Sequence, residues 1–182
     1  MGELQNGFQS RRVRVYTTRG VIDGSLRISP MLRSLDELNV VSRHFVTLHE
    51  PDTSGVPWTF SGKNEIAVNR SSILFLYELS NPPRTSGRNV GGTFTRAAVR
   101  LAVEDYRIEG FLHVPPGGAA MKRLNQSNHP FLSLTSVSAV GPDTQFAAAF
   151  LAVNQRHILA GQEIEQAPEP KGEPEMSIEL TS

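Results

Sequence analysis

The chain has 182 residues, of which 38% are apolar and 20% charged, a composition typical of a soluble protein with one domain or two small ones. It contains no cysteine, which excludes disulfide bonds, thiolate zinc sites and cysteine nucleophiles. The formal net charge is zero, but residues 165–182 hold five Glu and one Lys, which leaves 17 basic and 13 acidic residues elsewhere, a balance of +4. This asymmetry is a weak indication of an anionic partner, and a solvated surface of mixed sign is the simpler explanation.

The chain carries no targeting or membrane signal that its sequence reveals. Residues 1–10 hold no apolar run of the kind that a secretory signal needs. No apolar stretch approaches the roughly 20 residues that span a bilayer. We therefore expect a cytoplasmic protein that does not enter a membrane, with residues 1–12 as an N-terminal arm.

One sequence unit occurs twice. Shifting the chain by 86 residues gives ten identities over residues 13–48 without a gap. The matched pairs include Val13 with Val99, Gly24 with Gly110, Asn39 with Asn125 and Phe45 with Phe131. After a deletion of one residue, Ala67-Val68-Asn69 matches Ala152-Val153-Asn154, and Ile73-Leu74 matches Ile158-Leu159. The chain is therefore a tandem duplication with units at 13–79 and 99–164.

Each unit has the pattern of five β-strands. Alternating apolar residues predict strands at 13–16, 22–28, 45–48, 65–69 and 73–79, and at the matching positions of the second unit, where the last two are 150–154 and 158–164. Gly24 and Gly110 fall inside the second strands, where glycine usually marks a bulge or bend. The fold class expected is all-β, with two tandem five-stranded bent-sheet small barrels, a linker at 80–98 and a disordered acidic tail at 165–182.

The duplication also predicts the core. The alternation places six apolar residues of each unit inside. These are Val15, Ile22, Leu26, Phe45, Val68 and Ile73, with Leu101, Ile108, Leu112, Phe131, Val153 and Ile158 as their counterparts.

The order of these residues resembles the Sm/LSm superfamily of small bent β-barrels that form RNA-binding rings. Val13, Val15, Gly20, Ile22, Gly24 and Leu26 fit the spacing of the first Sm motif, and Asp36-Glu37-Leu38-Asn39 resembles its closing part. The segment 66–73 has the shape of the second motif, with Asn69-Arg70 where Arg-Gly is usual. The sequence departs from the family because Asp36 lies twelve positions after Gly24, and the second unit has Lys122 in its place.

Residues 33–39 are also similar to an Arg-x-x-Asp-x-Leu-Asn motif of uncharacterised bacterial proteins. That likeness implies a fold and no activity.

The resemblance to Sm rings implies a set of candidate RNA-binding residues. These are Asn39, Asn125, Asn69, Arg70, Asn154 and Arg156. An Asn side chain offers both a donor and an acceptor to a base edge. The competing interpretation is structural, because loop Asn residues often bond neighbouring backbone and a turn Arg is often solvated.

No residue pattern points to catalysis or to a cofactor. The five histidines, His44, His49, His113, His129 and His157, lack the spacing of a helical metal site, and no nucleophile elbow is present. We therefore expect no enzyme, no metal and no cofactor.

The fourth and fifth strands of each unit are among its most apolar segments, and a lone barrel would leave them as exposed edges. The two units of one chain can pair with each other and cover one edge each. The two edges that remain would form a ring or filament, and a ring of six barrels takes three chains. The function expected is a non-catalytic assembly or protein-interaction module, a trimeric pseudo-hexamer, with an RNA-binding Sm-like protein as the alternative. A monomer whose edges are capped by the linker or by residues 51–63 is the other possibility for the oligomeric state.

Overall fold

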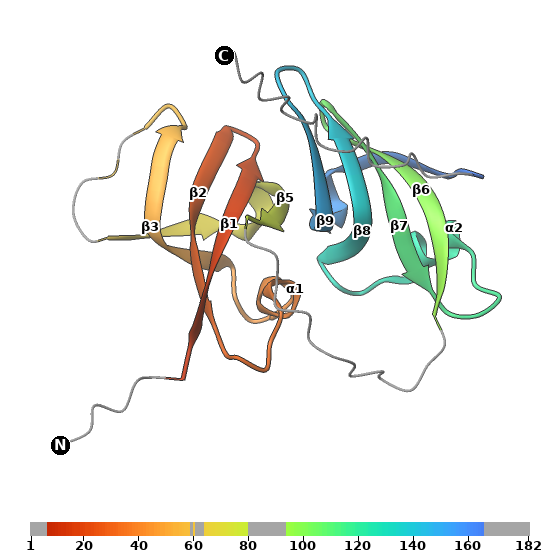
Figure 1. The fold of residues 1–182 in the computed structure, drawn as a ribbon, viewed down its shortest axis with the longest axis horizontal. Coiled ribbons are helices and arrows are strands. Elements are labelled where there is room, and N and C mark those ends of the chain that lie inside the picture. Colours follow the sequence, from red (N-terminus) through yellow and green to blue (C-terminus); the bar gives the residue numbers. More distant parts are fainter. Residues whose placement is uncertain (1–6, 59, 61–63, 80–93, 166–182) are drawn as a thin grey trace, which may run out of the picture.

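The computed structural model describes residues 7–58, 60, 64–79 and 94–165, and shows a chain built mainly of strands (Figure 1). The first unit contains β1 Gln9–Thr17, β2 Gly20–Ile28, β3 Phe45–Gly55, β4 Glu65–Asn69 and β5 Ile73–Glu78. The second contains β6 Thr95–Val103, β7 Tyr106–Val114, β8 Phe131–Val140, β9 Gln145–Asn154 and β10 Ile158–Glu163. The prediction of an all-β fold is confirmed.

In the described residues, four short helical segments connect the strands. They are α1 Ser34–Leu38, α2 Ala120–Gln126 and the 3-10 turns η1 Arg70–Ser72 and η2 Gln155–His157. Helices α1 and α2 differ from the predicted elements, because each is too short to show a helical period in the sequence. None of the helices in the described ranges is long and apolar enough to cross a membrane.

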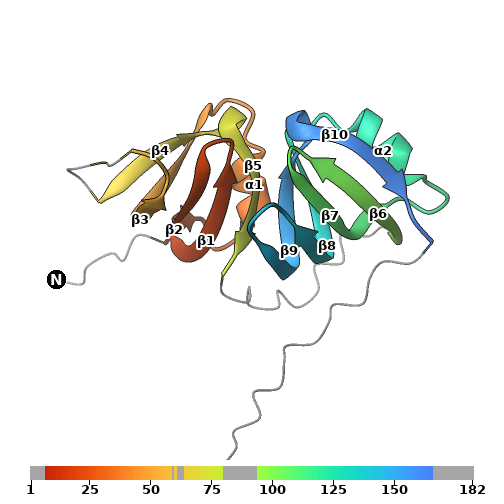
Figure 2. The same cartoon turned by 90° about the horizontal axis from the view of Figure 1, so that it is seen from above.

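All ten strands belong to one continuous sheet rather than to two closed barrels. The strand order is β10-β6-β7-β8-β9-β5-β1-β2-β3-β4, so each unit contributes five adjacent strands. Within the described residues, β4 pairs only with β3 and β10 only with β6, and these two strands are the edges of the sheet. The expectation of closed barrels is therefore corrected. Strand β5 pairs with β9 of the second unit and not with β4, so the first unit does not close into a barrel. Figure 2 shows the two bent halves meeting at β5 and β9.

The bends fall where the mid-strand glycines predict them. The pairing of β2 with β3 shifts register between Asp23 and Ser25, and that of β7 with β8 shifts between Glu109 and Phe111. A Cβ on Gly24 would lie 3.1 Å from the Cβ of Leu48, and one on Gly110 would lie 3.1 Å from the carbonyl oxygen of Thr135. A side chain at either bend would thus press on the neighbouring strand, which is consistent with glycine at both positions.

Several boundaries differ from those expected. Residues 9–12 of the expected arm belong to β1, and residues 95–98 of the expected linker belong to β6. Strand β3 continues to Gly55, and β8 and β9 form a hairpin that extends beyond the predicted strands. Most of the linker and of the acidic tail lies outside the described residues.

Two apolar cores fill the two halves of the sheet, and both extend across the junction between units. The first core takes in Phe131 and Ala152 of the second unit, and the second core takes in Tyr16 and Phe75 of the first. Aromatic rings also gather at this junction, with Phe146 stacked on Tyr77 at 4.9 Å between centroids. The two units are therefore held together by shared core packing.

Ten of the twelve predicted core residues are buried, and two are not. Phe45 was expected inside but is 54% exposed, whereas its counterpart Phe131 is 1% exposed. Ile158 is only half-buried, whereas its counterpart Ile73 is fully buried. Both exceptions lie beside a free edge of the sheet, and both counterparts lie at the junction where the other unit covers them.

Candidate functional site

The junction between the two units is an antiparallel pairing of β5 with β9. Phe75 lies opposite Val153 and Leu76 opposite Ala152. The expected pairing of the two units within one chain is thereby confirmed. Strand β5 is buried over its first four residues, as its nearly continuous apolar sequence predicts for a strand covered on both faces.

Asn39, at the end of α1, links the two units by hydrogen bonds. Its Nδ2 donates to the carbonyl oxygen of Phe131 at 3.1 Å, and its Oδ1 accepts from the N–H of Phe131 at 2.9 Å. The NH2 and the C=O of the side-chain amide thus both bond the backbone of the other unit, at the first residue of β8. Asn39 therefore has a structural role at this junction, which uses one N–H of its Nδ2 and one lone pair of its Oδ1.

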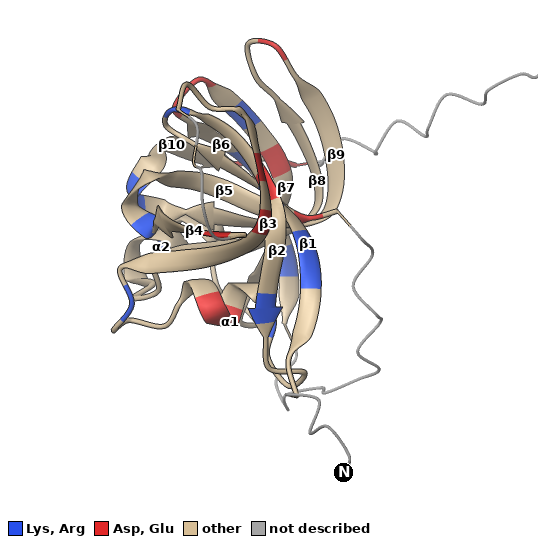
Figure 3. Cartoon of the chain, turned by 90° about the vertical axis from the view of Figure 1, so that its left-hand side faces the viewer, with Lys and Arg blue, Asp and Glu red and all other residues tan. Residues whose placement is uncertain are grey.

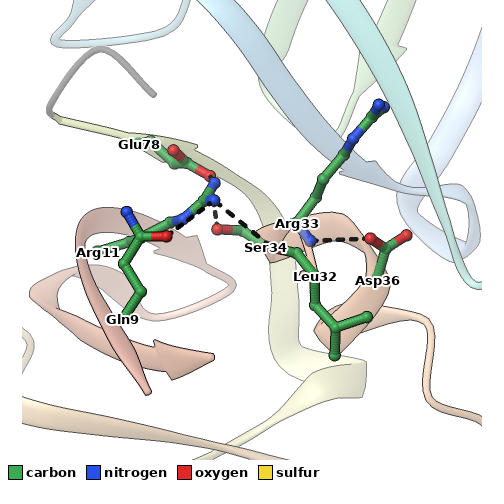
Figure 4. Close-up of polar contacts among 7 residues, drawn as sticks. All are labelled: Gln9, Arg11, Leu32, Arg33, Ser34, Asp36 and Glu78. Atoms are coloured by element: carbon green, nitrogen blue, oxygen red, sulfur yellow. Dashed lines mark hydrogen bonds and ion pairs between the residues drawn. The ribbon is translucent and has the colours of Figure 1, made fainter. Parts of the chain in front are cut away.

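The helix that carries Asn39 is tied to the sheet by polar contacts (Figure 4). The carboxylate of Asp36 accepts from the N–H of Arg33 at 2.8 Å and caps the helix start. The hydroxyl of Ser34 donates to Glu78 at the end of β5 at 2.6 Å, and the same oxygen accepts from Arg11 at 2.9 Å. Through these contacts, residues 33–39 position Asn39 against the second unit. The Arg-x-x-Asp-x-Leu-Asn segment therefore has a structural role.

In the second unit, different residues hold the equivalent short helix against the sheet. Glu163 is the counterpart of Glu78 and accepts from the N–H of Ala120 at the start of α2 at 3.2 Å. Lys122 stands where Asp36 stands in the first unit, so this helix start has no equivalent carboxylate cap. A glutamate at the end of the fifth strand therefore holds the short helix in place in both units.

Next to the junction lies a hollow of about 690 Å³ between η1 and η2. Four of the six candidate RNA-binding residues line it, namely Asn69, Arg70, Asn154 and Arg156. Asn39 is close by but occupied with Phe131, and Asn125 lines a different hollow on α2. Four residues predicted from the sequence thus lie together in space.

The two turn asparagines in this hollow fix backbone. Asn69 Oδ1 accepts from the N–H of Ser71 at 2.9 Å, and Asn154 Oδ1 accepts from the N–H of Arg156 at 3.1 Å, so each starts its 3-10 turn. The Nδ2 of Asn154 also donates to the carbonyls of Arg70 and Ile73, at 3.1 and 2.8 Å, across the junction. The Nδ2 of Asn69 makes no hydrogen bond within the described part of the chain, because no unit lies beyond β4 there.

Arg70 is also a structural residue. Its guanidinium donates to the carbonyl oxygens of Val40 and Arg43, and the residue is buried. Burial lowers the pKa of its guanidinium from the ordinary value, while the carboxylate of Glu37 opposes that shift. Arg70 thus holds the loop between α1 and β3 in place.

Only some of the residues that line the hollow are exposed to solvent. Arg156 is exposed, and its guanidinium makes no hydrogen bond to the residues that the structure describes. His44 and the ring of Phe45 are exposed beside it, and Arg43 is exposed while paired with Glu37. The hollow therefore combines cationic groups with one accessible aromatic ring.

Charge elsewhere does not gather into one basic field. Figure 3 shows basic and acidic residues of β1, β2 and their neighbours interspersed. Arg14 and Asp23 form a two-bond pair at 2.8 and 2.7 Å, and Arg100 pairs with Glu109 at 2.6 Å. These arginines are therefore paired with carboxylates of neighbouring strands and do not form a continuous basic surface.

The described residues hold no group of three or more His, Asp or Glu side chains arranged to bind a metal ion. Comparisons with protein-family models, with curated proteins and with solved structures find no match for this chain. The features that can indicate a function are therefore the geometry of the junction, the hollow beside it and the two free edges of the sheet.

Proposed function

We propose that this chain is a non-catalytic assembly module that joins further copies of itself through the free edges β4 and β10. One observation carries the proposal. Strands β4 and β10 are the counterparts of β9 and β5, which already pair with each other inside the chain. An edge that is apolar and unpaired favours strand addition, and here its complement is present on the opposite edge of the same molecule.

The geometry of such an assembly is heterologous, because the edge offered and the edge received are different. Heterologous contacts close into rings or continue as filaments. We propose a ring of six Sm-like units made by three chains, in line with the resemblance of both units to Sm barrels. The two five-stranded halves of the sheet support that interpretation, since the fourth and fifth strands of each half do not pair with each other.

The first expected result concerns mass in solution. Size exclusion coupled to light scattering, at tens of micromolar protein, should give three times the 20.0 kDa of one chain. A polydisperse mass that rises with concentration would indicate the filament form of the same assembly. A single species of 20.0 kDa at every concentration would contradict the proposal and favour capped edges.

RNA binding is the second candidate function, and the exposure of Phe45 favours it. An aromatic ring beside cationic groups is the arrangement on which an unstacked base can lie while a phosphate is neutralised. Phe45 and Arg156 both line the hollow and are both exposed. Arg156 is the only one of the six candidate residues that presents a charge free of described partners.

The RNA function has its own expected result. Electrophoretic shifts with oligo-U and oligo-A should appear at low salt and weaken as salt rises, because phosphate contacts release counterions. Arg156→Ala should weaken binding by roughly fivefold, the effect of losing one phosphate contact. Arg27→Ala, an exposed arginine on β2 outside the hollow, is the matched control and should change little. Absence of any shift at low salt and micromolar protein would end this candidate.

A further inference from the structure

Residues that are buried at the junction inside the chain have counterparts that are exposed at the free edges of the sheet. Phe131 is buried at the junction, and its counterpart Phe45 is 54% exposed. Leu74 is 3% exposed on β5, and its counterpart Leu159 on β10 is 67% exposed. In a duplicated chain, each counterpart has the same local pattern and a similar backbone. The difference therefore comes from the neighbour that one position has and the other lacks.

A hollow of about 330 Å³ lies where that neighbour would insert a side chain. It is lined by Met121, Leu124 and Asn125 of α2, by Gln155 of η2 and by Ile158, Ala160 and Gly161 of β10. In the first unit the matching positions include Leu35, Leu38, Ile73 and Leu76, and these share one apolar core with Phe131. The hollow on α2 and β10 is thus the second unit's version of the place that Phe131 fills in the first.

We infer that Phe45 of a second copy of this chain fills the hollow between α2 and β10, and that Asn125 bonds the backbone of that Phe45. This inference rests on the proposed assembly function and specifies the contact that produces it. The hollow and Phe45 lie at opposite ends of the sheet, beside β10 and β4, so one chain cannot fill its own. The occupant is a second copy because its Phe45 has the same residue type and strand position as the Phe131 that fills the equivalent place.

Asn125 supplies the hydrogen bonds of this proposed contact. Its counterpart Asn39 uses both ends of its side chain on the N–H and C=O of Phe131. Asn125 is exposed and makes no hydrogen bond with the described residues, and the backbone N–H and C=O of Phe45 are its equivalent partners in a second copy. Asn69 complements it, because its counterpart Asn154 donates to the carbonyls of Arg70 and Ile73, whose equivalents are the carbonyls of Gln155 and Ile158.

The equivalence also fixes the register of strand pairing between copies. Inside the chain, Phe75 lies opposite Val153 and Leu76 opposite Ala152. Translating each residue to its counterpart places Ala160 opposite Val68, and Gly161 opposite Ala67. A shift by one residue would turn the apolar faces away from each other, so this register is the one that continues both cores.

Because the chain has no native cysteine, the register can be tested directly by disulfide formation. The double variant Val68→Cys with Ala160→Cys should form covalent multimers under mild oxidation, since directly opposite residues approach closely enough for a disulfide. Val68→Cys with Gln162→Cys is the matched control, on the same strand and two residues out of register. It should give much less cross-linking.

Self-association of single variants supplies the second readout. Phe45→Ala should raise the dissociation constant between copies by roughly 30-fold or more, as for a buried aromatic anchor. Phe8→Ala, which removes an exposed ring near the start of β1, should leave it unchanged. Asn125→Ala should raise it by roughly tenfold, with Lys122→Ala on the same helix as control.

The outcomes separate this contact from the assembly function itself. Multimers that form without the Val68–Ala160 cross-link, or that cross-link equally in the control pair, would overturn the contact and leave the assembly function standing. Multimers that are indifferent to Phe45→Ala would overturn the contact as well. A chain that stays at 20.0 kDa throughout would overturn both.

Discussion

Phe131→Ala is expected to lower the free energy of unfolding by about 3–5 kcal/mol, the usual loss when a buried aromatic ring is truncated. The ring is 1% exposed and belongs to the first unit's core, although the residue starts β8 of the second unit. Its loss therefore leaves a cavity at the junction and weakens the attachment of the two halves. Urea unfolding followed by circular dichroism measures the effect.

The matched control for this variant is its counterpart. Phe45→Ala, measured at a concentration where the chain is monomeric, should cost less than about 1 kcal/mol because the ring is largely solvated. Equal losses at the two positions would contradict the assignment of Phe131 to the junction and of Phe45 to a free edge.

Glu78→Ala is expected to cost about 3–5 kcal/mol of stability, because it leaves the buried guanidinium of Arg11 without its counter-charge. The two side chains are only 7% and 6% exposed and lie 2.9 Å apart. Glu78 also accepts from Ser34, so the variant releases α1 and with it the hold of Asn39 on the second unit. Thermal unfolding of the variant measures the loss.

Two further variants show whether burial is the cause. Asp23→Ala removes the partner of Arg14 in a more exposed pair and should cost about 1 kcal/mol or less. Replacing both Arg11 and Glu78 with Met should recover a large part of the loss, because no unpaired charge is left inside. A Glu78→Ala cost as small as that of Asp23→Ala would show that the Arg11–Glu78 pair is solvated.

The repeat itself is what the sequence predicted best. Val13 and Val99 each occupy a core position, and Gly24 and Gly110 each occupy a bend. Because these roles depend on nearby residues in the chain, the matching identities can be recognised from the sequence alone. The pairing of the two units was also predictable, because a strand as apolar as β5 must be covered on both faces.

What the sequence could not provide was the difference between two copies of one pattern. Phe45 and Phe131 look alike in sequence, and only the position of β4 at the edge and of β8 beside the junction makes one exposed and the other buried. The same holds for Asn39 and Asn125, whose partners depend on which unit lies beyond them. The Arg11–Glu78–Ser34 cluster was missed because Glu78 lies 67 residues from Arg11 and 44 from Ser34, and no local pattern links them.

The extended β8–β9 hairpin was missed for a related reason. Its outer half buries Val137 and Ala139 but leaves the facing residues of β9 exposed or half-buried, and small residues such as Ala147, Ala148 and Ala149 give little contrast between the two faces. It is held by the stacking of Phe146 on Tyr16 and Tyr77, at 5.5 and 4.9 Å, which are contacts made across the junction. Such tertiary support leaves no period in the sequence.

The proposed assembly requires that β4 and β10 pair between copies as β9 and β5 pair within one chain. Hydrogen exchange followed by mass spectrometry, at tens of micromolar and again after dilution, reports on this pairing strand by strand. We expect slow exchange of peptides covering 65–69 and 158–163 at high concentration, faster exchange on dilution, and constant protection of β5. Fast exchange of both edge strands at every concentration would contradict the pairing.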